Sequence, residues 1–261
     1  MAHTDLRTEV KLTTEMVPAS QVADSMIGHG FERVKVMHGG SFKQSRTVVI
    51  APTRGMIHHR TVASWQSMLQ PMNQARAFIF CAGDEVGIAY NKMIANILAD
   101  PVLSTWDYVL TLEDDNLVPP DAHIRLLESI EDTRCDAVSG IYFTKGDFNA
   151  PMAYGDPAEY ARTGVLDFRP RTPAEITAAL AQGQTMEVNG IAMGCALWKM
   201  DLFRQVQPPW FVTVSDIVNG GAQSFTQDLK FCEVARRQGK RFAVDFRVRV
   251  GHLDVRTGEV Y

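Results

Sequence analysis

Cysteine is scarce in this chain, which has only four in 261 residues. Cys81, Cys135, Cys195 and Cys232 lie far apart and form no CxxC pair. This spacing argues against a zinc site built on cysteines and against the disulfide framework of a small secreted domain. We therefore expect reduced thiols in the core.

Long apolar runs and a strong net charge are also missing. No segment has the roughly 20 apolar residues of a membrane span, and the N-terminus lacks the apolar stretch of a signal peptide. A net charge of -4 and a pI near 6.0 provide no global attraction to nucleic acid or to an anionic membrane. We expect a soluble, cytoplasmic protein.

What the chain does have is ordinary globular composition, with 46% apolar and 21% charged residues. Residues 1–46 are polar and weakly patterned, which predicts a short N-terminal extension. Residues 47–261 are expected to form one catalytic domain. In its first half, short apolar runs alternate with stretches of helical spacing, which predicts a parallel, doubly wound α/β sheet. Strands are expected at 47–51, 77–82, 106–112 and 136–143, and helices at 59–69, 87–100 and 119–130.

The second half is less regular. Residues 144–185 are rich in glycine and proline with only short elements, and we interpret them as long loops over one face. A strand is expected at 192–200, a helix at 226–239 that ends at its glycine, and closing strands at 241–252.

Three carboxylates, Glu113, Asp114 and Asp115, follow directly after the third expected strand. In open α/β sheets ligands bind at the carboxyl ends of the strands, so this position is informative. Mg²⁺ and Mn²⁺ prefer carboxylate oxygens and leave room for substrate phosphates. Acidic turns are common, however, and this motif alone leaves metal binding and a solvated turn equally open.

Three further features each have a structural and a functional interpretation. His252 ends a strand and could be a third metal donor if the fold brings it to Asp115. Asp228, in the first turn of a helix, is either an ordinary helix-end carboxylate or a general base. Trp210 and Phe211 either plug the core or form a stacking platform for a sugar.

Taken together and in order, these segments resemble a GT-A glycosyltransferase of the family 2 type. "YVLTLEDDNLVPPDAHIRLL" looks like the DxD strand end, "NGIAMGCALWKMDLFRQVQPPWF" like the strand before the acceptor wall, and "TQDLKFCEVARRQGKRFAVDFRVRVGH" like the Glu-Asp helix and the metal histidine. The resemblance covers residues 47 to 254. It departs from the family pattern at Glu113, which opens the DxD motif, and at Gln227, which replaces the glutamate beside Asp228.

The resemblance implies a GT-A, Rossmann-like, mostly parallel sheet flanked by helices, and a role for each matching position. Mn²⁺ or Mg²⁺ would be held by Asp115, His252 and Glu113, and Asp228 would be the base of an inverting transfer. A retaining mechanism is the alternative if Asp228 lies far from the acceptor. Trp210, Phe211 and Gln227 would face the acceptor. The nucleotide-sugar donor, a UDP-sugar by preference, would contact the following residues: Pro52, Thr53, Arg54, Asp84, Asn91 and Asp114.

The acceptor is left open as a glycan, a small molecule or modified DNA. Some phage enzymes of this general kind glycosylate hydroxymethylated bases, and the location would then be the cytoplasm of a bacterial host. DNA as acceptor requires a local basic face, for which the late basic residues are candidates: Arg236, Arg237, Lys240, Arg241, Arg247 and Arg249. A nucleotidyltransferase and a non-catalytic nucleotide-sugar binding protein are the alternatives of other classes.

Overall fold

The computed structural model describes residues 13–18, 33–38, 45–70, 75–218 and 221–261. The chain divides into two compact units, Met1–Gln44 and Ser45–Tyr261. In the first unit the described residues form two antiparallel strands, β1 (Thr13–Pro18) and β2 (Arg33–His38). The rest of the extension expected over residues 1–46 lies outside the described residues, apart from the start of the next strand.

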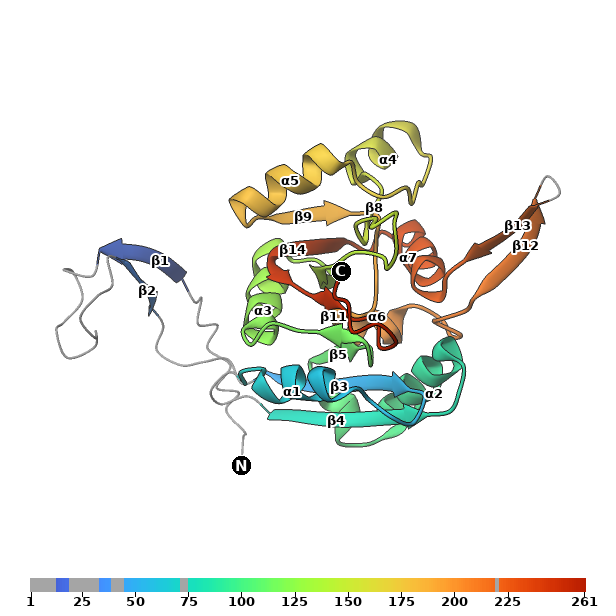
Figure 1. Ribbon diagram of the computed structural model, residues 1–261, viewed down its shortest axis with the longest axis horizontal. Coiled ribbons are helices and arrows are strands. Elements are labelled where there is room, and N and C mark those ends of the chain that lie inside the picture. The colour runs from blue at the N-terminus through green and yellow to red at the C-terminus, as the bar shows by residue number, and fades with distance from the viewer. Residues whose placement is uncertain (1–12, 19–32, 39–44, 71–74, 219–220) are drawn as a thin grey trace, which may run out of the picture. The chain divides into compact units, whose positions relative to one another are not determined.

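The second unit is built on a seven-stranded sheet of order β4-β3-β5-β11-β7-β14-β9 (Figure 1). Strands β3, β4, β5, β7 and β14 run in one direction, while β11 and β9 run against their neighbours. The strands are β3 (Arg46–Thr53), β4 (Ala75–Ala82), β5 (Tyr108–Leu112), β7 (Ala137–Ile141), β9 (Thr185–Val188), β11 (Cys195–Lys199) and β14 (Phe242–Arg249).

Helices cover both faces of this sheet. Their bounds are α1 (His59–Ser67), α2 (Val86–Ala99), α3 (Ala122–Thr133), α4 (Pro157–Thr163), α5 (Pro173–Gln182), α6 (Met200–Gln205) and α7 (Gln227–Arg237), with a 3-10 turn at Leu103–Thr105. Paired short strands complete the unit: β6 (Asn116–Leu117) with β15 (Gly251–His252), β8 (Ala153–Tyr154) with β10 (Gly190–Ile191), and β12 (Val214–Val218) with β13 (Gly221–Phe225).

Alternation along the central strands divides the core between the two faces. In β3, Val48 and Ile50 pack toward α2, while Val49 and Ala51 pack toward α1 and α3. All four side chains are completely buried, as expected for a strand covered on both sides. The predicted α/β fold class with a mostly parallel sheet is therefore confirmed. No helix within the described ranges has the length and apolarity needed to cross a membrane.

The interpretation of residues 144–185 as long loops is wrong, because α4 and α5 lie there. Each helix has proline in its first turn and a left-handed glycine, Gly164 or Gly183, at its end. The prolines and glycines that suggested loops are therefore the normal start and stop residues of two helices. Thr172 and Glu175 also form a reciprocal capping box at the start of α5.

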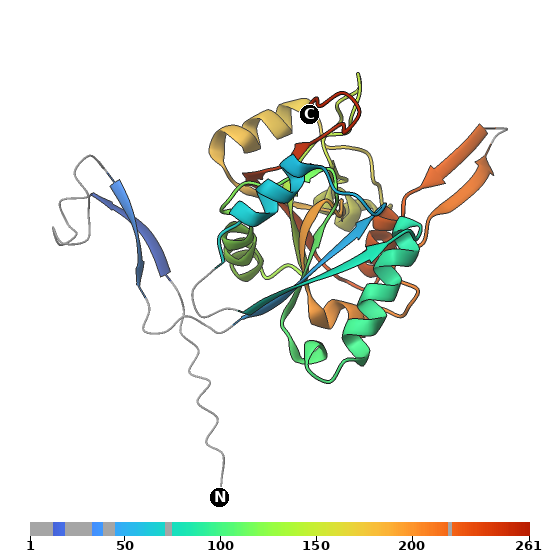
Figure 2. The ribbon, with the colours of Figure 1, turned by 60° about the horizontal axis from the view of Figure 1, so that its bottom comes forward.

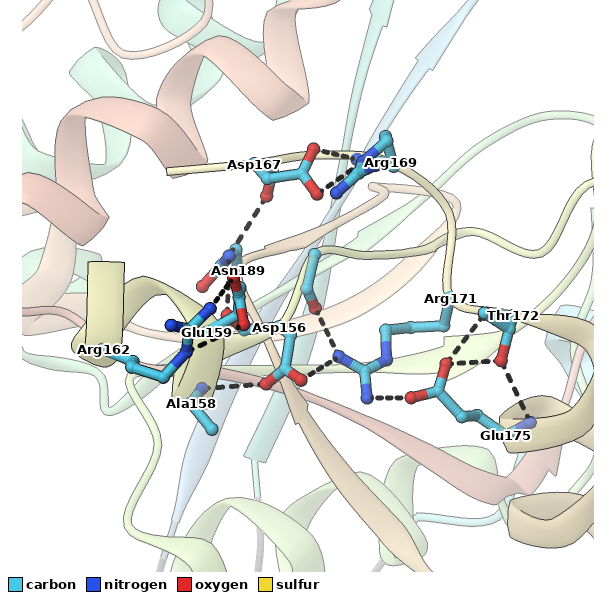
Figure 3. Close-up of polar contacts among 11 residues, drawn as sticks. Asp156, Ala158, Glu159, Arg162, Asp167, Arg169, Arg171, Thr172, Glu175 and Asn189 are labelled. Atoms are coloured by element: carbon cyan, nitrogen blue, oxygen red, sulfur yellow. Dashed lines mark hydrogen bonds and ion pairs between the residues drawn. The ribbon is translucent and has the colours of Figure 1, made fainter. Parts of the chain in front are cut away.

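Arg171 connects these two helices, as Figure 3 shows. Its guanidinium lies 3.2 Å from Asp156 at the start of α4 and 2.5 Å from Glu175 in the first turn of α5. The bidentate geometry of arginine suits such a bridge. The segment is thus an ordered part of the unit. The β12–β13 hairpin, by contrast, extends away from the sheet in both views (Figures 1 and 2).

Candidate active site

The candidate site lies where β3 and β5 end side by side. The two strands are parallel and paired, so Arg54 and the carboxylates that follow Leu112 emerge at the same edge of the sheet. The backbone N–H of Arg54 donates to Asp114 Oδ2 at 3.3 Å, which connects the two strand ends. The backbone N–H of Glu113 donates to the Gly194 carbonyl at 3.3 Å, just before β11. The sheet thereby fixes the acidic segment on both sides.

Asp115 and His252 are brought together by the short β6–β15 ladder. His252 pairs with Asn116 in that ladder, and the backbone N–H of Leu253 donates to the Asp115 carbonyl at 2.8 Å. His252 Nε2 then lies 3.6 Å from Asp115 Oδ2. The other ring nitrogen, Nδ1, lies 2.8 Å from the Phe143 carbonyl, which can only accept. Nδ1 must therefore carry a proton, and Nε2 is the ring nitrogen that faces Asp115.

Lys145 completes this group. Its ammonium lies 2.5 Å from the same carboxylate oxygen, Asp115 Oδ2. Burial by itself would raise the pKa of Asp115, but the pairing with His252 and Lys145 outweighs burial and lowers that pKa. Asp115 is thus an ionised carboxylate at neutral pH.

The residues present fit a divalent cation as a two-donor site. Asp115 would supply a carboxylate oxygen, and His252 would supply Nε2 while its Nδ1 is held by a carbonyl, as in most histidine ligands. In the described part of the chain no group of three or more His, Cys, Asp or Glu side chains is arranged to hold a metal. Glu113, Asp115 and His252, the three ligands predicted from the sequence, therefore do not form such a group among the described residues. Mg²⁺ commonly uses one or two protein carboxylates and takes its other ligands from substrate phosphates and water.

Glu113 and Asp228, both half-buried, form an acidic cluster together with Asp114 and Asp115. Burial, followed by the charges of Asp115, Asp228 and Asp114, raises the pKa of Glu113 to about 8. Asp228 lies in the first turn of α7 and accepts a hydrogen bond from its neighbour's backbone, Leu229 N–H, at 2.8 Å. Burial raises the pKa of Asp228 as well. Two carboxyl groups from different elements therefore share one poorly solvated region.

Two tyrosine side chains, Tyr90 and Tyr142, lie near this acidic cluster. Tyr90 on α2 is completely buried, and its hydroxyl has no hydrogen-bond partner among the described residues. Burial and the nearby charges of Glu113 and Asp228 raise the pKa of Tyr90 far above its ordinary value. Tyr142 is equally buried and accepts a hydrogen bond from the backbone of Gly194 at 2.8 Å. Both phenols thus stay protonated beside the carboxyl groups.

A hollow of about 360 Å³ opens beside Asp115. Its lining combines three cations with three carboxylates: Arg54, Lys145 and Arg256 with Asp114, Asp115 and Asp254, together with Gly146, Val255 and Tyr261. An adjoining hollow of about 230 Å³ shares Arg54, Asp114 and Val255 with the first. Its other lining residues are Met56, Ile57 and His58. The site therefore offers a mixed-charge cleft of the size needed for a small ligand.

Some donor contacts predicted from the sequence do not lie in this cleft. Arg54 and Asp114 line both hollows, whereas Pro52, Thr53 and Asp84 line neither. The Asp84 carboxylate instead accepts from Lys92 Nζ at 2.8 Å.

Asn91, also predicted to contact the donor, binds the backbone of a neighbouring segment. Its Oδ1 accepts from the backbone N–H groups of Trp210 and Phe211 at 2.8 and 3.2 Å, and its Nδ2 donates to the Phe211 carbonyl at 2.6 Å. The amide is therefore fully used in tying α2 to the segment before β12.

The prediction that the rings of Trp210 and Phe211 form an acceptor platform is wrong, because both rings are buried in the core. Trp210 is 7% exposed and its indole N–H donates to the Val206 carbonyl at 2.8 Å. Phe211 is 2% exposed and packs on Phe231 with ring centroids 4.8 Å apart. The third predicted acceptor residue, Gln227, begins α7 and accepts from Thr213 Oγ1 at 3.4 Å.

Sequence analysis missed Lys145, Arg256 and Tyr261. Lys145 follows β7, so the same rule that identified the acidic segment after β5 would have found it. Arg256 and Tyr261 belong to a tight C-terminal turn in which the backbones of His252 and Tyr261 exchange two hydrogen bonds of 3.0 Å. No local pattern in the sequence indicates that this turn returns to the cleft.

The raised pKa of Glu113 predicts a stability cost at high pH. The folded state binds a proton more tightly than the unfolded chain, whose glutamate has an ordinary pKa of 4.5. Stability is therefore lost as the pH rises from that value toward about 8. Glu113→Gln removes the ionisation, and at pH 8 we expect it to raise the free energy of unfolding by about 2 to 4 kcal/mol, with little change at pH 4.

Urea unfolding with chelator at both pH values would measure this difference. Glu175→Gln is a matched control of opposite sign, because its hydrogen bonds with Thr172 lower the pKa of Glu175. That variant should be less stable than the wild type at pH 8. An equally stable or less stable Glu113→Gln protein at pH 8 would contradict the burial argument.

Comparison with known structures supports the fold. No protein-family model matches the sequence, and no curated protein matches it. A197 from STIV superposes with a TM-score of 0.55 at 14% identity, covering 80% of this chain and 85% of that one. GalNAc-T7, solved with UDP, GalNAc and Mn²⁺, superposes with a TM-score of 0.50 at 11% identity, covering 83% of this chain and 45% of that one. The chain is thus similar in fold to a glycosyltransferase of the GT-A type and spans about half of it.

Proposed function

We propose that the protein is a metal-dependent glycosyltransferase that moves a sugar from a nucleotide-sugar donor, a UDP-sugar, to a hydroxyl group of an acceptor. The observation that carries this proposal is the Asp115–His252 pair at the carboxyl end of the sheet, because Asp115 also lines a cleft that contains basic side chains. The superposition on GalNAc-T7, which was solved with UDP and Mn²⁺, agrees with that choice of donor and metal.

Asp115 and His252 would hold the divalent cation. A cation there offsets the charge that develops on a leaving diphosphate, which is Lewis-acid catalysis. Arg54 and Arg256 line the cleft and would attract the diphosphate. Asp114, which accepts from the backbone of Arg54, would orient the donor at the junction of the two strand ends.

Asp228 would be the general base. The acceptor hydroxyl would transfer its proton to the Asp228 carboxylate as its oxygen attacks the anomeric carbon, while the bond from that carbon to the diphosphate breaks. Burial raises the pKa of Asp228, which strengthens its carboxylate as a proton acceptor. A single displacement of this kind inverts the anomeric configuration. Tyr90 and Tyr142 would keep the region around the base poor in water.

Thermal denaturation with a panel of nucleoside diphosphates, each with Mn²⁺ and with chelator, tests the proposal. A ligand that binds only the folded state raises the melting temperature by mass action, so a ligand at 100 times its Kd adds about 2.7 kcal/mol. We expect UDP with Mn²⁺ to stabilise the protein more than UDP with chelator. No stabilisation by any nucleoside diphosphate in either condition would refute the proposal.

Modified DNA is less favoured as the acceptor. Three of the late basic residues that suggested it are paired with carboxylates of the chain: Arg237 with Glu233, Arg241 with Glu187, and Arg247 with Asp245 and Glu128. Their charges are therefore largely neutralised, and the basic face that a DNA acceptor requires is weakened. We propose a glycan or small-molecule hydroxyl instead. Turnover of a nucleotide-sugar would distinguish a glycosyltransferase from a binding protein. Release of a nucleoside diphosphate, and not of inorganic pyrophosphate, would distinguish it from a nucleotidyltransferase.

A further inference from the structure

Lys145 holds the position on Asp115 that a metal ion would need. Its ammonium lies 2.5 Å from Asp115 Oδ2, the same oxygen that His252 Nε2 faces at 3.6 Å. Mg²⁺ binds carboxylate oxygens at about 2.0 to 2.1 Å. A metal shared by Asp115 and His252 and an ammonium in contact with the same oxygen would overlap and repel each other. Metal and Lys145 must therefore occupy this oxygen in turn.

Hydrogen bonds within the loop that carries Lys145 fix the position of its backbone. It lies between β7 and β8, where the backbone N–H of Thr144 donates to the Ala150 carbonyl and Thr144 Oγ1 accepts from the Ala150 N–H, both at 2.8 Å. Gly146 next to Lys145 has a φ of +88°, a conformation that favours glycine. The base of the loop is fixed while the four-carbon lysine stem can rotate. Lysine is suited to such an exchange because its charge is compact and its donors are rotatable.

The cleft provides the second position for this ammonium. Lys145 and Gly146 line the hollow together with Arg54 and Arg256. Arg256 is only loosely held, with its Nε 3.8 Å from Asp254 Oδ1. An anionic ligand in the hollow would therefore meet three cationic side chains from three separate segments of the chain, beside the carboxylates of Asp114, Asp115 and Asp254.

We propose that Lys145 is an internal counter-ion that neutralises Asp115 in the metal-free protein and passes to the diphosphate when a metal takes its place. The second half of this inference rests on the proposed function, whereas the first half concerns the metal alone. In the absence of the diphosphate, Lys145 keeps Asp115 from binding the metal tightly. Metal and diphosphate therefore bind to the site together. The site would thus avoid holding a divalent cation in the absence of donor.

Isothermal titration with Mn²⁺ alone, with no nucleotide present, tests the first half. We expect Lys145→Met to bind Mn²⁺ about tenfold more tightly than the wild type, because a competing positive charge is removed from the metal ligand. Lys145→Gln is a second variant that keeps polarity. Lys240→Met is the matched control, since Lys240 contacts Gln205 and does not line the cleft. Equal or weaker Mn²⁺ binding by both Lys145 variants would overturn the inference, as would no binding by any protein.

Titration with UDP in the presence of chelator tests the second half. The wild type should retain metal-free affinity for UDP, and Lys145→Met should lose at least about fivefold of it. Unchanged metal-free affinity would overturn the transfer of Lys145 to the diphosphate. Failure of the proposed function looks different, because the wild type would then bind no nucleoside diphosphate with or without Mn²⁺, while the result with Mn²⁺ alone would stand.

Discussion

Asp228→Asn is expected to lower the rate of sugar transfer by about 10²- to 10⁴-fold, the usual contribution of a general base. The fold should survive, because asparagine has nearly the same shape and keeps an oxygen for the Leu229 N–H. Burial already favours the neutral form of Asp228, so the neutral amide introduces no new buried charge. The affinity for UDP and Mn²⁺ should stay within a few-fold of the wild type.

Release of UDP from a UDP-sugar, with water or a simple alcohol as acceptor, would measure the rate. A base must be ionised to act, so the wild-type rate should rise with pH around a midpoint above the ordinary aspartate pKa of 3.8. Asp228→Asn should lack this rise. Glu233→Gln is the matched control on the same helix, since Glu233 pairs with Lys230 and Arg237 on the surface of α7. A variant that keeps more than about a tenth of the wild-type rate would rule out Asp228 as the base.

The sequence predicted the central sheet well because its strands are buried on both faces. Runs such as Val48–Ala51 have no exposed side chain. A continuous apolar run of this length is typical of a strand in the middle of an α/β sheet, where helices cover both faces. The direction of β11 could not be predicted. Its five residues pair antiparallel with β5 and β7, and an isolated apolar run has the same pattern in either direction.

The sequence predicted those site residues whose positions follow from the ends of strands. It could not predict which side chains are used in contacts within the protein. Asp115 and His252 meet because the backbone ladder between β6 and β15 brings them together. Asn91 was predicted to contact the donor, yet its amide is used by the backbone of Trp210 and Phe211. Asparagine has the same donors and acceptors in either role, so its residue type could not distinguish a ligand contact from a structural one.

The burial of Trp210 and Phe211 has a similar cause. From sequence alone, an aromatic pair after two prolines is compatible with an exposed stacking platform and with packing in the core. The tertiary structure determines which of the two occurs. Here α6 and α7 supply Phe203 and Phe231, which enclose the Phe211 ring at centroid distances of 6.1 and 4.8 Å. The free energy of burying a large aromatic side chain favours this position over an exposed one.

Asp115→Asn is expected to remove the metal-dependent part of UDP binding and leave the metal-free part. Loss of a residue that only orients a metal ligand costs 10- to 100-fold in metal affinity, so loss of the ligand itself should cost about 100-fold or more. The amide cannot neutralise Lys145, whose ammonium lies 2.5 Å from the carboxylate in the wild type. The released Lys145 should therefore remain available to the diphosphate, and UDP affinity in chelator should be equal to or higher than that of the wild type.

Calorimetric titration of UDP with Mn²⁺ and with chelator measures both parts. Asp254→Asn is the matched control, because it removes one carboxylate from the same cleft, and its side-chain oxygen can still accept from the Arg256 N–H at the turn. That variant should keep the Mn²⁺ dependence, since Asp254 takes no part in the Asp115–His252 pair. If Asp115→Asn kept the full Mn²⁺ enhancement, the metal would have to be held elsewhere. If it lost metal-free binding too, the transfer of Lys145 from Asp115 to the diphosphate would be refuted.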